Sequence, residues 1–566
     1  IPLLFSEMVI GQYTQKGPSI AYKYYTPMLQ GLGWAVVVGS VCVASYYNVI
    51  VAWCVVYMAE IAFGGTPRMV SCGNQWNTLH CDSALENEAC RAQLNTSFIS
   101  VQGHCFPRVA TNRTMSLISA SDEYFQFHIL ERTNSLEEFG GMNYKILGAL
   151  VGCWLLIFIT LIKGVKLMGQ ISLFTATAPF VLIAILFVRS VTLEGAGEGL
   201  KYYMTEPDWS YLFKLETWRE ALSQMCFSIS VGTGGIMAMS SYNNFHQNIY
   251  RDVLIIIAAD TFMAIFGGVT VFCTLGFIAK ELQLPVKDVV QSSLGLAFIV
   301  YPEAINRMPG AAIWAFFFFF FLFLLGLTSI PGMLLGLIRC ICEEFNISNK
   351  RQIIVTAVVC VACCLSGIIF ATKAGIYWFY IVNDFMGGLA LTMCIVVQVI
   401  ITHFFYGPTR FFEDVREMMG EPKTVCGRWF GASGYIIQAF FAFCVPAFSV
   451  IIVVANMFHT PIVYGSKDRL YEFPGWTETF GWTIGLAPLV CIPVYVVVNI
   501  VEAKRNDQPL MSILHVHPLH PSYDRINADY TDFEPPQTRP HASEVSPLIS
   551  TTSATPHDES NPATSN

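Results

Sequence analysis

The chain has 566 residues, of which 54% are hydrophobic and 13% are charged. Soluble domains carry about 25% charged residues, so this composition excludes the ordinary soluble and disordered classes and predicts a polytopic membrane protein. The net charge of −8 indicates nothing about partners.

Apolar segments long enough to cross a bilayer recur along the whole chain. A partial one opens the chain at Ile1, and the others lie near 30–63, 145–162, 169–188, 217–244, 253–279, 310–342, 353–371, 375–404, 431–458 and 480–501. Residues after 502 are rich in Pro, Ser and Thr and predict a disordered tail. We therefore assign no metal site to His515, His517 and His520, which lie in that tail.

The one long polar segment between spans is 64–143, which carries four cysteines and two glycosylation sequons. These residues are Cys72, Cys81, Cys90, Cys105, Asn95 and Asn112. An even cysteine count beside sequons indicates an extracellular, oxidising compartment, and the residues themselves leave three disulfide pairings open. Alternation of sides then places 14–30, 405–430 and the tail in the cytoplasm, with weak support from the Lys and Arg of the short loops.

The span at 217–244 contains an unusual run, FSISVGTGGIMAMSS, from Phe227 to Ser241. Glycine costs about 1 kcal/mol relative to alanine in a helix, and hydroxyls offer the backbone other partners, so the helix is expected to break here. Broken helices form the midplane binding sites of secondary transporters, because non-helical backbone persists in a bilayer only where protein buries it or where it lines a cavity. The alternative is a continuous helix whose small residues pack against a neighbour.

Several long motifs occur in an order that resembles the neurotransmitter:sodium symporter family (solute carrier family 6). They include IPLLFSEMVIGQY at 1–13, ASYYNVIVAW at 44–53, KGVKLMGQ at 163–170, TLEGAGEGLKYY at 192–203, WREALSQMCFSISVGTGG at 218–235, SSYNNF at 240–245, YPEAINRMP at 301–309 and FFYGPTRFFEDVREMMG at 404–420. The resemblance implies an all-α membrane protein of twelve spans with the inverted-repeat sodium symporter fold. It places Ile1 inside the second span, so the first span and the start of the second are expected to be missing from this chain.

The same resemblance implies the domain organisation. Residues 1–63 would hold the partial second span and the third, 64–143 the glycosylated extracellular loop, 144–216 the fourth and fifth spans, 217–404 the sixth to tenth, 405–501 a cytoplasmic loop with the eleventh and twelfth, and 502–566 the disordered tail. Within the loop it pairs Cys72 with Cys81, which leaves Cys90 with Cys105.

Two sodium sites are implied by the resemblance. Ser228 and Asp260 belong to the first, with Asp260 standing where the family usually has asparagine; Leu325, Thr328 and Ser329 belong to the second. Sodium prefers hard oxygen donors, so a carboxylate in place of an amide keeps the ligand type and adds charge. The alternatives are a protonated or ion-paired acid at Asp260, and hydroxyls in the eighth span that bond only within their own helix.

A substrate site is implied at Val43, Tyr47, Phe227, Ser230, Thr233, Ser329 and Met333. Tyr47 matches a tyrosine that meets the carboxylate or amine region of the substrate, and Phe227 matches an aromatic lid; a tyrosine satisfied within the bundle is the alternative. The pocket is mostly apolar, and no acid for an amine is visible beyond Asp260. We therefore expect a small neutral amino acid or a related amine. In the tenth span Asn383 aligns with an acidic gate residue, and Asp384 follows it.

The expected activity is sodium-coupled symport by alternating access. Animal members of the family help to bind chloride with a serine where this chain has Ala264, one turn after Asp260. The Asp260 carboxylate is on the same helical face and is expected to supply the compensating charge, so chloride should not be required. The alternative is a non-transporting accessory or receptor-like protein on the same scaffold, which the departures at Asp260, Thr233 and Asn383 favour.

An enzyme is not expected, because no nucleophile–base pair or metal motif lies on a polar domain. The expected partners are the substrate, sodium ions and the lipid bilayer, with no nucleic acid. EVSPLI, from Glu544 to Ile549, has the form of an acidic di-leucine signal for sorting adaptors. The expected location is therefore the plasma membrane, with endosomal cycling.

Overall fold

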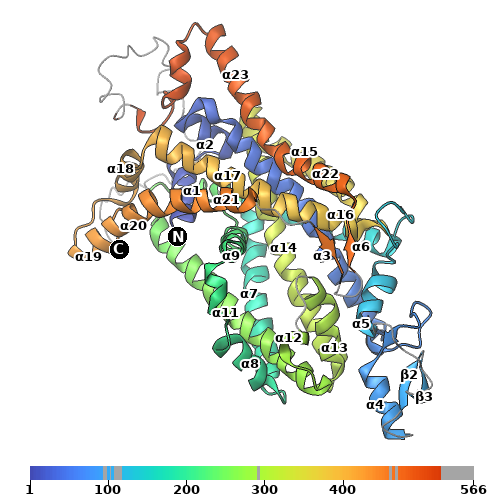
Figure 1. Cartoon of the computed structure of the whole chain (residues 1–566). Helices are drawn as coiled ribbons and strands as arrows, with labels where there is room; N and C mark the ends of the chain where they lie inside the picture. Colours follow the sequence, from blue (N-terminus) through green and yellow to red (C-terminus); the bar gives the residue numbers. More distant parts are fainter. Residues whose placement is uncertain are drawn as a thin grey trace, which may run out of the picture. The chain divides into compact units, whose positions relative to one another are not determined.

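A computed structural model describes residues 1–93, 98–101, 103–107, 118–162, 164–289, 294–457, 462–465, 470–523 and 525. The sequons at Asn95 and Asn112, the EVSPLI motif and residues 526–566 lie outside these residues. Within them the protein is a bundle of long apolar helices, as the composition predicts (Figure 1).

Within the described ranges, nine helical segments are long and apolar enough to cross a membrane. Six are built on the single helices α3 (Gly31–Ala62), α6 (Tyr144–Leu161), α7 (Val165–Val191), α11 (Ile249–Leu282), α14 (Ala311–Glu344) and α15 (Asn349–Gly367). The other three are composite: α16 (Gly375–Val382), η7 (Asn383–Ala390), α17 (Leu391–Ile400) and η8 (Ile401–Tyr406); α19 (Val425–Phe430), α20 (Tyr435–Ala439), η9 (Phe440–Cys444) and α21 (Val445–Met457); and α22 (Gly475–Leu486), η10 (Ala487–Val490) and α23 (Cys491–Arg505).

The remaining expected span, 217–244, does not form one helix. It is divided into α9 (Leu215–Ser228) and α10 (Gly235–Ser240). The chain opens with α1 (Pro2–Thr14), α2 (Pro18–Tyr25) and η1 (Pro27–Leu29). Shorter elements join the long helices: α8 (Ala196–Thr205), η4 (Trp209–Phe213), α12 (Val286–Val289), η5 (Leu296–Val300), α13 (Tyr301–Asn306), η6 (Ile368–Ala371), α18 (Pro408–Met419), and the strands β5 (Val463–Tyr464) and β6 (Tyr471–Glu472).

The centre of the bundle is α3, which packs along α14 and also contacts α6, α15 and α23. Three of its aromatic side chains, Tyr46, Trp53 and Tyr57, are fully buried: Tyr57 stacks on Phe319 of α14, and Trp53 meets Phe125 and Phe298 edge to face. Without a hydrophobic difference between lipid and protein, such close van der Waals packing is what holds membrane helices together. By contrast, α7 and α15 expose many apolar side chains, as helices facing lipid would.

The polar loop is held by two disulfides, Cys72–Cys81 and Cys90–Cys105, and the expected pairing is confirmed. Its elements are η2 (Thr66–Val70), β1 (Cys81–Asp82), α4 (Ala84–Gln93), β2 (Phe98–Val101), β3 (His104–Pro107), β4 (Ile118–Ser119), α5 (Ala120–Glu123) and η3 (Tyr124–Ile129). The strands β1 and β4 pair in parallel, and β2 and β3 pair antiparallel.

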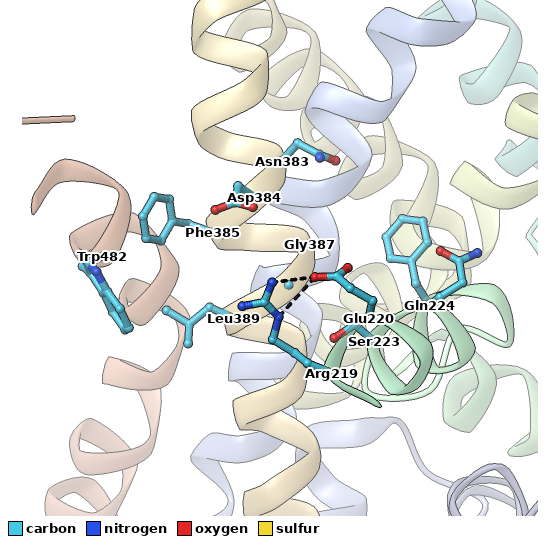
Figure 2. Close-up of a pocket in the computed structure, with 12 residues that line it drawn as sticks. Arg219, Glu220, Ser223, Gln224, Asn383, Asp384, Phe385, Gly387, Leu389 and Trp482 are labelled. Atoms are coloured by element: carbon cyan, nitrogen blue, oxygen red, sulfur yellow. Dashed lines mark hydrogen bonds and ion pairs between the residues drawn. The ribbon is translucent and has the colours of Figure 1, made fainter. Parts of the chain in front are cut away.

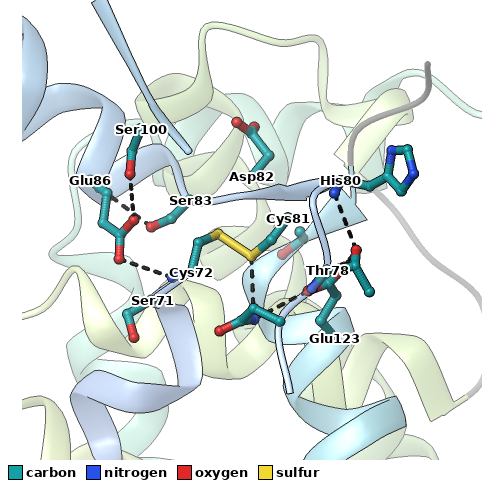
Figure 3. The surroundings of a disulfide bond; sticks show 12 residues. Ser71, Cys72, Thr78, His80, Cys81, Asp82, Ser83, Glu86, Ser100 and Glu123 are labelled. Atoms are coloured by element: carbon teal, nitrogen blue, oxygen red, sulfur yellow. Dashed lines mark hydrogen bonds between the residues drawn. A yellow bond between two sulfur atoms is a disulfide. The ribbon is translucent and has the colours of Figure 1, made fainter. Parts of the chain in front are cut away.

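Two carboxylates, the half-buried Glu86 and the buried Glu123, fix the chain around the first disulfide. Figure 3 shows Glu86 accepting a hydrogen bond from the backbone of Cys72, and Glu123 accepting from Thr78. Because both acceptors come from helices outside the small disulfide ring, they tie that ring to the rest of the loop.

The expected boundary of the tail at 502 is wrong. The last long helix, α23, continues to Arg505, and the next residues form η11 (Leu510–Leu514), which lies against α23 and η1. The segment up to Tyr523 belongs to the same compact unit as the bundle. Composition predicts disorder for this segment because the contacts that order it come from residues far away in the sequence.

Candidate substrate and sodium sites

The helix break lies where the glycine and hydroxyl residues predict it. Helix α9 ends at Ser228, α10 begins at Gly235, and the backbone between them has positive φ at Ser230 (54°), Gly232 (81°) and Gly234 (71°). A non-glycine residue in this region is disfavoured, so the strain at Ser230 must be offset by surrounding contacts.

Local hydrogen bonds shape the interrupted segment. The Thr233 hydroxyl donates to the Ser230 carbonyl at 2.7 Å, and the backbone N–H of Val231 donates to the Cys226 carbonyl at 3.0 Å. The hydroxyl residues thus replace helical bonds with bonds of their own, which is the mechanism that the sequence predicts.

Glu7 of α1 holds the interrupted segment from outside. Its Oε1 accepts a hydrogen bond from the backbone N–H of Gly232 at 2.6 Å, and the residue is 1% exposed. A buried carboxyl group costs free energy unless polar groups compensate it, so this bond to a backbone amide without a helical partner stabilises both groups. The sequence interpretation missed Glu7, although an acid inside an apolar segment is by itself a signal of function in a membrane protein.

Two more helices fix the same segment. Ser40 of α3 donates to the Thr233 carbonyl at 2.6 Å. Gly235 lies so close to α14 that a Cβ placed on it would be 2.6 Å from the Gly332 carbonyl oxygen. The interrupted segment is therefore enclosed by α1, α3 and α14, as non-helical backbone at membrane depth requires.

The two residues expected at the first sodium site lie together. Ser228, at the end of α9, donates a hydrogen bond from Oγ to Oδ1 of Asp260 in α11 at 2.6 Å. They are 32 residues apart in the sequence, so this contact depends on the fold rather than on local structure. The pair presents hard oxygen atoms of the kind that sodium prefers, one neutral and one acidic.

The residues expected at the second sodium site occupy one stretch of α14. The Thr328 hydroxyl donates to the Leu324 carbonyl at 2.6 Å and lies 3.3 Å from the Thr175 carbonyl of α7, and the Ser329 hydroxyl donates to the Leu325 carbonyl at 3.1 Å. The bonds to Leu324 and Leu325 lie within α14, as expected from the alternative in which these hydroxyls bond only within their own helix. A hydroxyl that donates its proton still has lone pairs, so the bonds are compatible with ligation.

A small cavity adjoins the interrupted segment, with a volume of about 20 Å³, which is room for little more than one water molecule. Four of the residues expected to bind substrate line it: Val43, Phe227, Thr233 and Met333. Tyr47 and Ser329, also expected to bind substrate, lie close to one another. Sequence reasoning missed the other wall, which includes Ser40 and two sulfur-bearing side chains from the tenth-span region, Met386 and Cys394.

A second, more polar pocket lies beside Phe227, which lines both (Figure 2). Arg219 and Glu220 of α9 form an ion pair at 2.6 Å on one side of it, and Asn383 and Asp384 of η7 lie on the other. Phe227 is thus shared by the cavity at the interrupted segment and by a polar pocket that is lined by Asn383 and Asp384.

The family model described as Sodium:neurotransmitter symporter family matches residues 1–503. The chain belongs to this family. Members of the family are sodium-coupled transporters and not enzymes.

Three relatives show the same likeness along most of the chain. It is 32% identical over 548 residues to the Sodium-dependent transporter snf-5 of Caenorhabditis elegans, with 94% of this chain and 74% of the relative covered. It is 32% identical over 508 residues to the Sodium- and chloride-dependent glycine transporter 1 of Xenopus laevis, covering 88% and 76%. Over 510 residues it is 32% identical to the Sodium- and chloride-dependent creatine transporter 1 of Bos taurus, covering 89% and 76%.

Proposed function

We propose that this protein transports sodium together with a small neutral amino acid or a related amine across the plasma membrane, and that it does not require chloride. The observation that carries the proposal is the 2.6 Å contact between Ser228 and Asp260 beside the interrupted segment. The contact puts an acidic side chain next to the hydroxyl that is proposed as a sodium ligand.

Charge balance supports independence from chloride. A carboxylate and a sodium ion about 4 Å apart attract by roughly 4 kcal/mol at an effective dielectric constant of 20. An anion bound nearby would supply a comparable attraction in a transporter with a neutral residue at this position. Since Asp260 carries the charge on the protein itself, and Ala264 one turn later offers no hydroxyl, a bound chloride adds little here.

The lining of the cavity supports the substrate class. Its walls are mainly aliphatic, aromatic and thioether side chains, and its polar groups are Ser40 and Thr233. Both of these hydroxyls already donate to carbonyls of the interrupted segment. Such a site favours a compact ligand with an apolar or small side chain, and the names of two relatives suggest glycine and creatine as first test substrates.

Uptake measurements test the proposal. Radiolabelled glycine, alanine, leucine, proline and creatine are offered to cells expressing the protein, in sodium chloride, sodium gluconate and choline chloride. We expect uptake of at least one substrate in both sodium media and none in choline. Loss of nearly all uptake in gluconate would remove the argument for Asp260, and a surface-expressed protein that takes up no substrate in a wider panel would favour the non-transporting scaffold.

A matched pair of variants separates the charge of Asp260 from its shape. In gluconate, Asp260→Asn should raise the half-saturating sodium concentration, and chloride should partly restore it. Ser228→Ala should raise the half-saturating sodium concentration equally in both media, because it removes an oxygen and no charge. Equal behaviour of the two variants would contradict the proposed role of the carboxylate.

A further inference from the structure

A buried arginine lies at the end of the bundle where α13 and the loop helices α4 and α5 are found (Figure 1). This residue, Arg307, belongs to the YPEAINRMP motif and directly follows α13, and its side chain is 2% exposed. Its Nη1 lies 3.4 Å from Oε1 of Glu88 in α4 and 3.5 Å from Oε2 of Glu281 in α11, and its Nη2 lies 3.6 Å from Oε1 of Glu303 in α13. A buried cation is costly unless it is paired, so Arg307 holds carboxylates from three helices around it.

Glu303 extends this cluster to the start of α5. Its Oε2 accepts a hydrogen bond from the Ser121 hydroxyl at 2.8 Å, and the Ser119 hydroxyl lies 3.4 Å from the same oxygen. Burial raises the pKa of the Glu303 carboxyl, while its bond with Ser121 and the charge of Arg307 lower it, so both partners favour the charged form. Removal of Arg307 would leave a buried acid without its cation.

Helix α13 depends on such contacts for its position. It has only six residues, which is too short for a helix that is stable by itself. On its other side the Tyr301 ring stacks on Phe318 of α14, with ring centroids 4.2 Å apart, and Ala304 and Ile305 are buried. Apolar packing thus fixes one side of α13, and the ion pairs of Arg307 fix the other.

The two outer partners of Arg307 belong to rigid elements. Glu88 lies in α4, where Cys90 is bridged to Cys105 of β3, and where Asn87 accepts a hydrogen bond from the backbone N–H of Ser100 at 2.7 Å. Glu281 lies near the end of α11, the long helix that also carries Asp260. At 1.5 Å per residue, these two acids of α11 are about 30 Å apart along one continuous helix.

We propose that Arg307 is a positioning residue that couples the disulfide loop to α11. The same nitrogen of Arg307 faces Glu88 of the loop and Glu281 of α11, and α13 is held between them. A displacement of either partner therefore changes the free energy of the other through this side chain, and by linkage the effect is reciprocal. The coupling does not require that Asp260 binds sodium. Where sodium does bind there, the same coupling carries its effect along α11 to the loop.

Hydrogen exchange of the full chain in lipid nanodiscs tests the coupling, with peptides from α4, α13 and the last turns of α11. Glu281→Gln keeps the shape and removes the charge, and should accelerate exchange in α4 about 2- to 5-fold. Glu88→Gln should accelerate exchange in the last turns of α11 by a similar factor. Arg307→Gln should accelerate exchange in α13 at least about 10-fold, because it breaks a buried ion pair from one side.

A double-mutant cycle and two further variants separate coupling from a general loss of stability. In the Arg307→Gln background, Glu281→Gln should cause no further acceleration in α4, because the route between the two helices is gone. Arg307→Lys keeps the charge and should recover most of the protection. Arg91→Gln removes the same charge from an exposed position of α4 and should change none of the three peptides.

Equal exchange of α4 in Glu281→Gln and in the parent protein would overturn the proposal, and so would fully additive effects in the double variant. Both tests use half-exposed glutamates, so they remain decisive if Arg307→Gln fails to fold. Replacement of choline by sodium adds a test in the same samples: sodium should slow exchange in α4 of the parent protein and not of Arg307→Gln. Slower exchange in α4 of both proteins would contradict the role of Arg307. Exchange that sodium changes nowhere would contradict the proposed sodium site instead, and the cycle would still decide the coupling.

Discussion

Replacement of Glu7 by glutamine should weaken the interrupted segment without removing its hydrogen-bond acceptor. The buried carboxyl group accepts from the Gly232 N–H at 2.6 Å. A hydrogen bond between neutral groups contributes about 1 kcal/mol, and the glutamine amide must re-form this bond with a different donor and acceptor arrangement, so the variant should lose about 1 kcal/mol. That loss corresponds to about 5-fold in an equilibrium constant.

The half-saturating sodium concentration for uptake is the appropriate measurement, because Gly232 is four residues from Ser228 in the same segment. Glu7→Leu should be more severe than Glu7→Gln, since it leaves the Gly232 N–H without an acceptor at a further cost of about 1–3 kcal/mol. Met8→Leu, a volume-conserving change at the next buried position of α1, should behave as the parent protein does. If Glu7→Gln at normal surface expression gives the parent's sodium dependence and maximal rate, Glu7 does not control the conformation of this segment.

Three further predictions concern other parts of the molecule. Thr328→Val keeps the shape of the side chain and removes its oxygen, so the half-saturating sodium concentration should rise about 10- to 100-fold; an unchanged value would rule out the second sodium site. Cys72→Ala removes a disulfide, which commonly costs about 2–5 kcal/mol, and should reduce surface expression; a free thiol at Cys72 in protein from the cell surface would contradict the bridge. Burial lowers the pKa of His517 in the packed tail segment to about 4, with Lys23 lowering it further and Glu502 partly opposing this. When the segment is detached, its His517 binds a proton as the pH falls below about 6.5, so packing of the tail should weaken about tenfold between pH 7.5 and 5.5. Protection of the tail amides from hydrogen exchange that does not change with pH, after correction for intrinsic exchange, would contradict this prediction.

Features that depend on local physical chemistry could be predicted from the sequence. The break between α9 and α10 follows from the glycine and hydroxyl content of one short run, and the long helices follow from apolar segments of spanning length. The disulfide pairing and the proximity of Ser228 and Asp260 followed from resemblance to the family, because neither contact is visible in local composition.

Features that depend on distant contacts could not be predicted in the same way. Glu7 and Gly232 are 225 residues apart, and nothing near either residue indicates the other. The tail segment has a composition typical of disorder, and its order comes from partners on α1, α2, η8 and α18. The order of this segment was missed because composition measures how much apolar area a segment can bury by itself, whereas here α1, α2, η8 and α18 supply the apolar surface.

Helix α1 connects the interrupted segment with the packed tail segment. Glu7 holds the strained backbone at Gly232, and Tyr13, six residues later, contacts Ser522. Between them, the Gln12 side chain donates to the carbonyls of Phe245 and Gln247, just beyond the end of α10. A helix rises about 1.5 Å per residue, so these attachments lie within about 9 Å along one rigid element. A displacement of α1 that breaks one of them strains the others, and the tail at the surface is therefore mechanically linked to the backbone that encloses the candidate sodium and substrate sites.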